Sequence, residues 1–159
     1  MPRTSRHLAP RNSAPRRIVV RNSGIHGKGV YATTGIPKGT RIIEYKGKRM
    51  SSEAADNKYG DEEGPHTFLF LLDDGTVIDA NRGGNSARWI NHSCNPNCEP
   101  VEEGGRMFID ARRNIEHGDE LTYDYQLVVE ERHTQEIKRL FACLCGSKRC
   151  RGNFLAERS

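Results

Sequence analysis

Short runs of β-branched and other apolar residues alternate with turns that contain glycine or proline along most of the chain. This pattern predicts many short strands and few amphipathic helices. The Asp74-Gly75 pair between two of the runs indicates a hairpin with a tight primed turn. The runs predict strands over residues 18–20, 30–33, 40–45, 67–72, 76–79, 98–101 and 107–111.

Three segments carry helical signals. Ser51 or Ser52 is expected to cap a short helix over residues 53–58. A helical turn is expected over residues 86–90, and residues 126–140 favour a longer helix. Because the chain contains no internal repeat or linker, we predict one mostly β domain of short, twisted strands with a small metal-binding appendage at its C-terminal end.

The composition agrees with a loop-rich β domain. The chain has 159 residues, of which 35% are hydrophobic and 29% charged, and it contains 16 glycines. This length is enough for one domain with a core, and the apolar fraction is low for a helical bundle. Because no apolar stretch approaches the ~18 residues of a membrane helix, we expect no membrane partner. The N-terminus has no apolar segment typical of a cleavable secretory signal.

The positive charge is concentrated in the N-terminal tail. The formal net charge is +4, and residues 1–17 contain five arginines and no acidic residue, which leaves −1 for residues 18–159. This composition predicts a disordered basic tail. The tail is either a solubilising or targeting arm or a weak anchor on nucleic acid through phosphate contacts. The near-neutral body argues against a nucleic-acid-binding groove in the domain itself.

Five cysteines are an odd number, and without a secretory signal a disulfide framework explains them poorly. Cys143, Cys145 and Cys150 lie within eight residues, a spacing that suits a tetrahedral zinc site. Unliganded or redox-active thiols are the alternative interpretation. The residues that remain as candidates for a fourth zinc ligand are Cys94, Cys98, His92 and His133.

Three motifs occur in a fixed order along the chain: Asn-His-Ser-Cys over residues 91–94, Glu-Leu-Thr-Tyr-Asp-Tyr over residues 120–125, and Cys-x-Cys-x4-Cys over residues 143–150. In combination they are highly specific. They resemble the SET-domain protein-lysine methyltransferases that carry a zinc-binding post-SET tail. The resemblance extends from about residue 17 to residue 155.

The resemblance implies a SET-domain fold of small curved sheets, short helices and a C-terminal zinc knuckle. The segment ending at Tyr125 is expected to thread beneath the loop that holds Asn91 and His92, forming a pseudoknot. The implied division is a tail over residues 1–17, a SET catalytic domain over residues 18–140 and a post-SET zinc-binding tail over residues 141–159.

The resemblance also implies S-adenosylmethionine as cofactor, bound on one face, with the target lysine entering a narrow channel from the opposite face. Methyl transfer from a sulfonium needs a neutral, aligned amine. Free lysine has a pKa of about 10.4, so the amine is mostly protonated at neutral pH. A narrow channel lined with aromatic rings disfavours the ammonium form.

Three tyrosines match catalytic positions of the family. Tyr125 is expected beside the methyl group, the target nitrogen and the sulfur, and Tyr45 is expected to form another wall of the channel. Tyr123 matches a position held by Phe or Tyr, where the hydroxyl crowds the space for further methyl groups. This match implies mainly monomethylation, with slower dimethylation. Each tyrosine could instead be an ordinary strand or core residue.

The resemblance assigns cofactor and metal contacts to further positions. Asn91 and His92 are expected to hold the cofactor by hydrogen bonds, and Gly27 and Gly29 to let the backbone approach its methionine end. The complete set of implied cofactor contacts is His26, Gly27, Lys28, Gly29, Phe68, Arg88, Trp89, Asn91, His92, Phe141 and Leu144. The implied zinc ligands are Cys94, Cys143, Cys145 and Cys150, which leaves Cys98 free.

The predicted function is S-adenosylmethionine-dependent methyl transfer to a protein lysine, on a histone or another DNA-packaging protein. The expected location is nuclear or chromosomal in a eukaryote, and cytoplasmic or nucleoid in a bacterium. The alternative is a catalytically idle, zinc-stapled module that grips a peptide or nucleic acid. The presence of Tyr125, Asn91 and His92 argues against this alternative.

Overall fold

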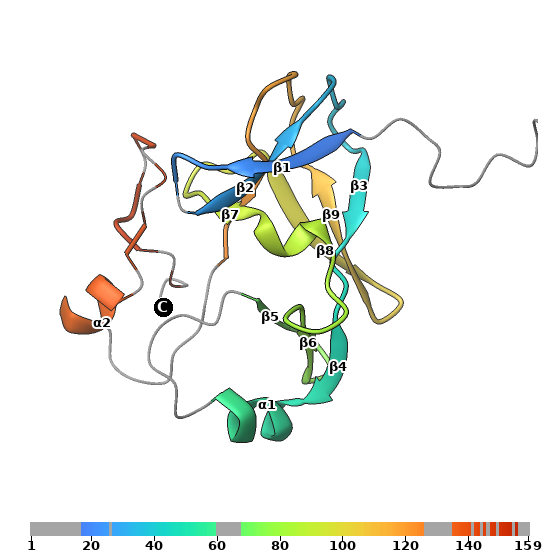
Figure 1. Cartoon of the computed structure of the whole chain (residues 1–159), viewed down its shortest axis with the longest axis vertical. Coiled ribbons are helices and arrows are strands. Elements are labelled where there is room, and N and C mark those ends of the chain that lie inside the picture. The colour runs from blue at the N-terminus through green and yellow to red at the C-terminus, as the bar shows by residue number, and fades with distance from the viewer. Residues whose placement is uncertain are drawn as a thin grey trace, which may run out of the picture.

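A computed structural model shows small, mostly antiparallel sheets and short helices packed around one core (Figure 1). The predicted mostly β fold is confirmed. No helix among the residues that the structure describes is long and apolar enough to cross a membrane. The structure describes residues 17–25, 27–59, 68–125, 135–140, 142–143, 145, 147–148, 150–153 and 155.

The first sheet forms from the two earliest apolar runs. Strand β1 (Ile18–Asn22) pairs antiparallel with β2 (Lys28–Ala32), as the sequence predicted for both runs. The glycine-containing turn between them is closed by a hydrogen bond of 2.7 Å from Ser23 N to Gly27 O. Because alternate residues of a strand face opposite sides, β2 buries Val30 and Ala32 in the core.

The second sheet has the order β3 (Arg41–Glu44), β9 (Arg106–Ala111) and β8 (Cys98–Glu103), all antiparallel. Gly104 and Gly105 connect β8 to β9, with φ values of 61° and 75°. A two-residue turn with both φ values positive matches the twist of the flanking strands and favours glycine at both positions. A primed turn therefore connects β8 to β9.

The third sheet has the order β4 (Lys48–Ser51), β6 (Thr76–Asp79) and β5 (Leu69–Leu71). The predicted β5–β6 hairpin is confirmed, because the two strands pair antiparallel. Its loop is the three-residue segment Asp73-Asp74-Gly75 that separates the two predicted strands, but the tight primed turn expected at Asp74-Gly75 is not what closes it.

Leu72 N donates to Thr76 O at 2.8 Å, and Gly75 N donates to Leu72 O at 3.0 Å. An ordinary turn closes first, and Gly75 at φ 88° then returns the chain to the ladder. Asp74 stabilises this arrangement, because its Oδ1 accepts from Thr76 N at 2.8 Å.

Helices are short, as expected. Helix α1 (Ser52–Tyr59) follows β4, and Ser51 Oγ accepts from Ala54 N at 3.0 Å, which identifies Ser51 as its cap. A 3-10 helix, η3 (Ser86–Trp89), provides the predicted helical turn before the Asn-His motif. Helix α2 (Gln135–Leu140) represents the end of the longer helix predicted over 126–140, and residues 126–134 lie outside the described residues.

The two motif strands meet at the centre of the molecule. Strand β7 (Asn91–His92) pairs in parallel with β10 (Thr122–Tyr123). Asn97 ties its loop to the crossing segment, because its Nδ2 donates to Glu120 O and its Oδ1 accepts from Thr122 N, each at 2.9 Å. These contacts are those that the expected pseudoknot requires. Fully buried side chains around the crossing include Val30, Ile36, Ile78, Ile90, Ile109, Ile115 and Leu121.

Candidate active site and metal centre

The crossing brings three of the predicted catalytic residues into one aromatic cluster. Tyr123 lies on β10 and its ring centroid is 5.0 Å from that of Tyr125. Tyr45 follows β3 and reaches the pair through Phe70 on β5, at 5.1 Å from Tyr45 and 6.1 Å from Tyr123. Residues from three separate strands thus form one wall of stacked and edge-to-face rings.

Burial keeps all three tyrosines neutral. It raises the pKa of Tyr45, Tyr123 and Tyr125 well above the ordinary value of 10, with smaller contributions from neighbouring acidic groups and tyrosines. The cluster therefore presents hydroxyl groups and apolar ring faces, without formal charge. Such surroundings favour a neutral amine over an ammonium ion.

The hydroxyls of Tyr125 and Tyr45 differ in their hydrogen bonding. Tyr125 donates to Ile90 O, which fixes its ring beside the Asn-His motif. Tyr45 is 1% exposed, and its hydroxyl has no hydrogen-bond partner in the described part of the chain. Leaving such a group unsatisfied costs about 1–3 kcal/mol, so a ligand that bonds to it would gain that amount.

His92 joins the aromatic cluster to the cysteines. Its Nδ1 accepts from Tyr125 N at 3.0 Å, and its Nε2 lies 3.3 Å from Cys94 Sγ. Burial lowers the pKa of His92 to about 4, against the opposing effect of Asp124. The imidazole is therefore neutral at pH 7, with Nδ1 as acceptor and the proton on Nε2, directed at the sulfur.

Asn91 connects the same motif to the glycine-containing turn. Its Nδ2 lies 2.9 Å from Lys28 O, 2.9 Å from Glu120 Oε2 and 3.1 Å from Ser23 Oγ. The predicted cofactor residues Asn91, Lys28 and His92 are thus brought together, and the two motif side chains are buried. Their side chains organise the surrounding backbone.

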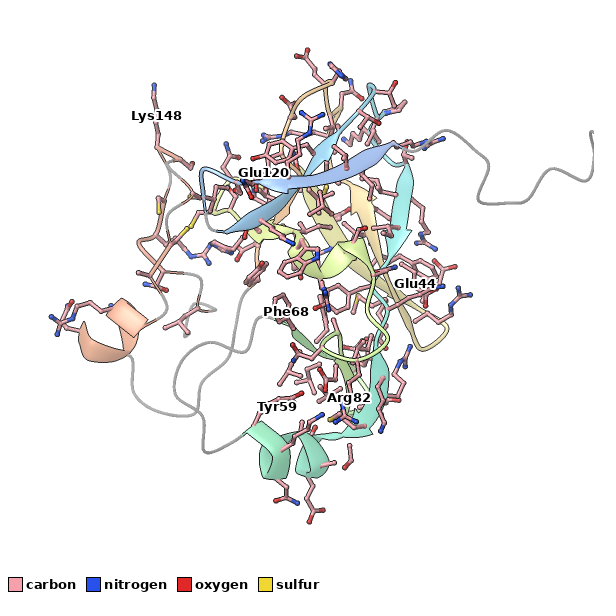
Figure 2. The ribbon with its side chains drawn as sticks, in the orientation of Figure 1. Glu44, Tyr59, Phe68, Arg82, Glu120 and Lys148 are labelled. Atoms are coloured by element: carbon pink, nitrogen blue, oxygen red, sulfur yellow. The ribbon has the colours of Figure 1, made fainter. Side chains whose placement is uncertain are left out.

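A second group of predicted cofactor residues gathers around Trp89. The ring of Phe68 lies 5.4 Å from that of Trp89, in an edge-to-face arrangement. Arg88 Cζ lies 4.6 Å and Lys28 Nζ 5.1 Å from the centroid of Trp89. Figure 2 shows Phe68 near the middle of the molecule, between the upper sheets and the sheet that contains β5.

The remaining predicted cofactor positions are two glycines, which differ in conformation and crowding, and three residues outside the described part of the chain. Gly27 has φ 46° and open space around its α-carbon, so a side chain there would be strained but not crowded. Gly29 has an ordinary φ and a crowded α-carbon. His26, Phe141 and Leu144 lie outside the described residues.

Four cysteines form a metal-binding geometry. The sulfur atoms of Cys94, Cys143, Cys145 and Cys150 all lie within 4.8 Å of one another, and those of Cys94 and Cys143 are 3.9 Å apart. Zinc–sulfur bonds of about 2.3 Å in a tetrahedron place sulfur atoms about 3.8 Å apart. The four residues therefore fit a structural zinc ion.

Backbone amides support the cluster. Arg151 N donates to Cys94 Sγ and Gly152 N to Cys150 Sγ, both at 3.3 Å. Amide donors of this kind stabilise thiolates and orient ligands. Of the open candidates for the fourth position, Cys94 is brought into the cluster. Cys98 is buried elsewhere, where burial raises its pKa to about 12, and His133 lies outside the described residues.

An ion pair that the sequence analysis missed ties the C-terminal segment to the second motif. Arg151 Nη1 and Nη2 donate to the two carboxylate oxygens of Asp124 at 2.7 and 3.0 Å. Arg151 Nη2 also donates to Leu155 O at 3.2 Å. Both partners stand inside or beside recognised motifs, but their pairing depends on the folded chain.

Comparison with known proteins agrees with this geometry. The SET domain family matches residues 27–126. Histone-lysine N-methyltransferase trithorax of Drosophila virilis is 42% identical over 140 residues, which cover 84% of this chain and 4% of the relative. Histone-lysine N-methyltransferase 2B of Homo sapiens is 39% identical over 152 residues, 92% of this chain and 5% of the relative.

A fungal relative extends the comparison. A histone-lysine N-methyltransferase of Chaetomium globosum, described as H3 lysine-4 specific, is 43% identical over 137 residues, 82% of this chain and 12% of the relative. The chain thus spans between 4% and 12% of the length of these three curated relatives. The matched part includes both the Asn-His motif and the second motif at residues 120–125.

Proposed function

The chain belongs to the SET domain family, and from this premise we propose that it transfers a methyl group from S-adenosylmethionine to the side-chain amine of a histone lysine. The observation that carries the proposal is the aromatic cluster. It combines neutral tyrosines from distant parts of the chain with a buried Tyr45 hydroxyl that has no partner in the described residues.

The tyrosines orient the amine and keep it neutral. Bound S-adenosylmethionine supplies an electrophilic methyl group on a sulfonium, so no side chain has to activate the donor. Desolvation of the amine in the buried channel beside Tyr123 and Tyr125 disfavours the ammonium form, and the proton leaves to solvent before the amine is enclosed. The Tyr45 hydroxyl is available to bond to the entering group, which aligns the nitrogen lone pair.

The cofactor would be held on the other side of the Asn-His motif. Gly27 ends the turn before β2, Asn91 donates to the carbonyl of Lys28 at the start of that strand, and Trp89 offers an aromatic face flanked by two cations. The neutral His92 holds the Tyr125 backbone in place through its Nδ1. In this arrangement the cofactor residues and the amine-binding tyrosines are organised by the same short motif.

Zinc would complete this site by fixing its C-terminal wall. Cys94 follows His92 by two residues, and the other three ligands belong to the C-terminal segment. The metal would therefore join that segment to the loop that organises the site. Its role in this proposal is structural, because four cysteine ligands leave no open coordination position.

Tyr123 would limit the product. It is 4% exposed and packs between Phe70 and Tyr125, so little room surrounds it. A hydroxyl at this position occupies space that a second methyl group on the amine would need. We propose monomethylation as the main outcome, with slower dimethylation.

The substrate proposal follows from the relatives. Several of them are named histone-lysine N-methyltransferases, and the fungal ones are described as specific for lysine 4 of histone H3. A peptide from the N-terminus of histone H3 is therefore the first substrate to test. A histone substrate would place the protein with chromatin.

The decisive experiment measures transfer of labelled methyl groups to core histones and to that peptide. Wild type is compared with Tyr125→Phe, and Tyr59→Phe is the matched control. Tyr59 also donates its hydroxyl to a buried partner, Asp79 at 2.7 Å, but lies outside the aromatic cluster. We expect Tyr125→Phe to lower the rate about 100-fold through loss of positioning, and Tyr59→Phe to keep the rate.

Two results would reject the proposal. One is equal transfer by wild type and Tyr125→Phe at matched folded concentration. The other is a wild-type protein that binds no S-adenosylmethionine by calorimetry and labels no histone. A protein that binds the histone peptide without transferring methyl groups would favour the idle binding module.

A further inference from the structure

Glu120 occupies a position between the cofactor turn and the catalytic strand. It is the first residue of the Glu-Leu-Thr-Tyr-Asp-Tyr motif and forms an isolated antiparallel bridge with Tyr31 of β2. The next residue, Leu121, is fully buried, and β10 begins one residue later. Figure 2 shows Glu120 beside β1 and β2, at the end of the molecule that carries the glycine-containing turn.

Its carboxylate collects hydrogen bonds from three separate segments. Ser23 Oγ lies 2.8 and 2.9 Å from the two carboxylate oxygens, and Tyr31 Oη lies 3.2 Å from Oε1. Asn91 Nδ2 lies 2.9 Å from Oε2. These partners are neutral hydroxyl and amide groups, and hydrogen bonds to a charged acceptor are roughly twice as strong as neutral ones. Glu120 therefore binds the turn, β2 and the Asn-His motif together.

The same carboxylate occupies the space where a side chain at position 29 would lie. A Cβ at position 29 would lie 2.3 Å from Glu120 Oε2 and 2.9 Å from Ser23 Cβ. Because the φ of Gly29 is not in the left-handed region, backbone freedom does not require glycine there. The lack of space favours glycine there, because the Glu120 carboxylate already lies where a side chain would be. This is a reason for Gly29 that is independent of any cofactor.

The contacts of Asn91 show why this matters for the site. Its amide nitrogen faces Glu120, Ser23 and Lys28 O. A carboxylate in position 120 accepts from the hydroxyl and the amide at the same time. A glutamine there would keep one acceptor and replace the other with a donor, so it could not accept from Asn91 Nδ2 and from both the Ser23 and Tyr31 hydroxyls as the carboxylate does.

We propose that Glu120 is a positioning residue for the cofactor: it holds Ser23 and β2 against Asn91, and Gly29 provides the space for its carboxylate. The inference rests on the proposed function, because it takes this turn as part of the S-adenosylmethionine site. Glu120 acts through the turn and Asn91, and it need not touch the cofactor or the reacting atoms.

The main test replaces the acceptor without changing its size. Glu120→Gln is compared with Glu116→Gln, an exposed glutamate four residues earlier in the same segment. We expect Glu120→Gln to raise both the Kd for S-adenosylmethionine and its KM about tenfold, the loss typical of a supporting contact. The KM for the histone peptide and kcat at saturating cofactor should stay near wild type. Glu116→Gln should leave all four values unchanged.

A double-mutant cycle tests the role of Gly29. Gly29→Ala should weaken cofactor binding by pushing the carboxylate aside, and Glu120→Asp should do so by shortening it. Combined, the shorter acid leaves room for the new methyl group, so the double variant should bind better than the two single losses predict. Strict additivity of the two losses would overturn the spatial part of the inference.

Hydrogen exchange separates this inference from the proposed function. In Glu120→Gln, the amides of residues 23–29 should exchange faster, whether or not the protein binds S-adenosylmethionine. If wild type binds no cofactor, the proposed function fails and exchange alone decides the role of Glu120. Unchanged exchange in the turn, or a loss confined to kcat, would overturn the inference. Should Glu120→Gln fail to fold, Ser23→Ala removes one donor and repeats the test more mildly.

Discussion

The strand crossing and the C-terminal cysteine segment meet at Cys94, but different forces stabilise them. At the crossing, β7 pairs with β10, and fully buried side chains such as Ile90 and Leu121 surround the pair. In the cysteine segment, the four cysteines are only partly buried, and their sulfur atoms contact one another, backbone amides and the His92 ring. Figure 1 shows this segment on one side of the sheets, beside α2.

The difference separates a region stabilised by burial from a region that zinc would stabilise. Hydrophobic burial stabilises the crossing in proportion to the apolar area removed from water. In the cysteine segment, zinc held by the four cysteines would add its binding free energy to the free energy of folding. One region holds the tyrosines of the site, and the other would close it.

The largest expected effect comes from removing the metal. A strong chelator should abolish methyl transfer and lower cofactor affinity, while the circular dichroism of the strands changes little. The reason is that only the cysteine segment loses its ligands. Transfer and dichroism are measured before and after chelation, and after zinc is added back. Cys98→Ser is the matched control, because Cys98 is buried outside the cluster and should leave zinc content unchanged. Normal methyl transfer by a zinc-free sample would contradict the statement that the cysteine segment closes the site.

A cavity at the crossing should have the opposite effect: it should lower the stability of the fold and leave zinc binding intact. Leu121→Ala should lower the free energy of unfolding by about 3 kcal/mol, within the range for a fully buried leucine. Below the unfolding transition the variant should still bind one zinc per chain. Urea unfolding and metal analysis of the same preparation check both statements. Loss of zinc at full native dichroism would show that the two regions are less independent than proposed.

A smaller effect is expected from the ion pair that joins the two regions. Arg151→Gln should weaken cofactor binding about tenfold by loosening the attachment of the cysteine segment to Asp124, since supporting contacts around a site are typically worth this amount. Zinc content should not change.

Calorimetry with S-adenosylmethionine and metal analysis provide the measurements for this variant. Lys148→Gln, an exposed change in the same segment, serves as control. Combining Arg151→Gln with Asp124→Asn should cost little more than either alone. Fully additive losses would mean that the pair does not act as a unit.

The smallest effect on rate is expected for Tyr123→Phe, which changes only the crossing. Removing this hydroxyl should shift the product from monomethyl-lysine towards di- and trimethyl-lysine, because the space beside the amine grows. Overall turnover should stay within about threefold, since the alignment supplied by Tyr125 is retained. Mass spectrometry of the modified peptide measures the product, and an unchanged distribution would refute the proposed limit.

Local patterns were reliable where neighbouring residues decide the structure. The runs before and after residues 23–27 became β1 and β2, and Ser51 caps α1 as expected. The hairpin was predicted with the correct three residues, 73–75, between its strands, but the primed turn type was wrong, because Gly75 N bonds to Leu72 O and Asp74 bonds to Thr76. The primed turn formed at Gly104-Gly105 instead.

By itself, the sequence determined the mostly β architecture, the order of the three motifs and the family, because these depend on residue type and spacing along the chain. Only the tertiary structure decided that Glu120 binds Ser23 and fills the space beside Gly29, and that Arg151 pairs with Asp124. Ser23 and Glu120 are 97 residues apart. Contacts over such separations depend on where strands cross and which atoms burial brings within hydrogen-bond distance, and no local pattern encodes that geometry.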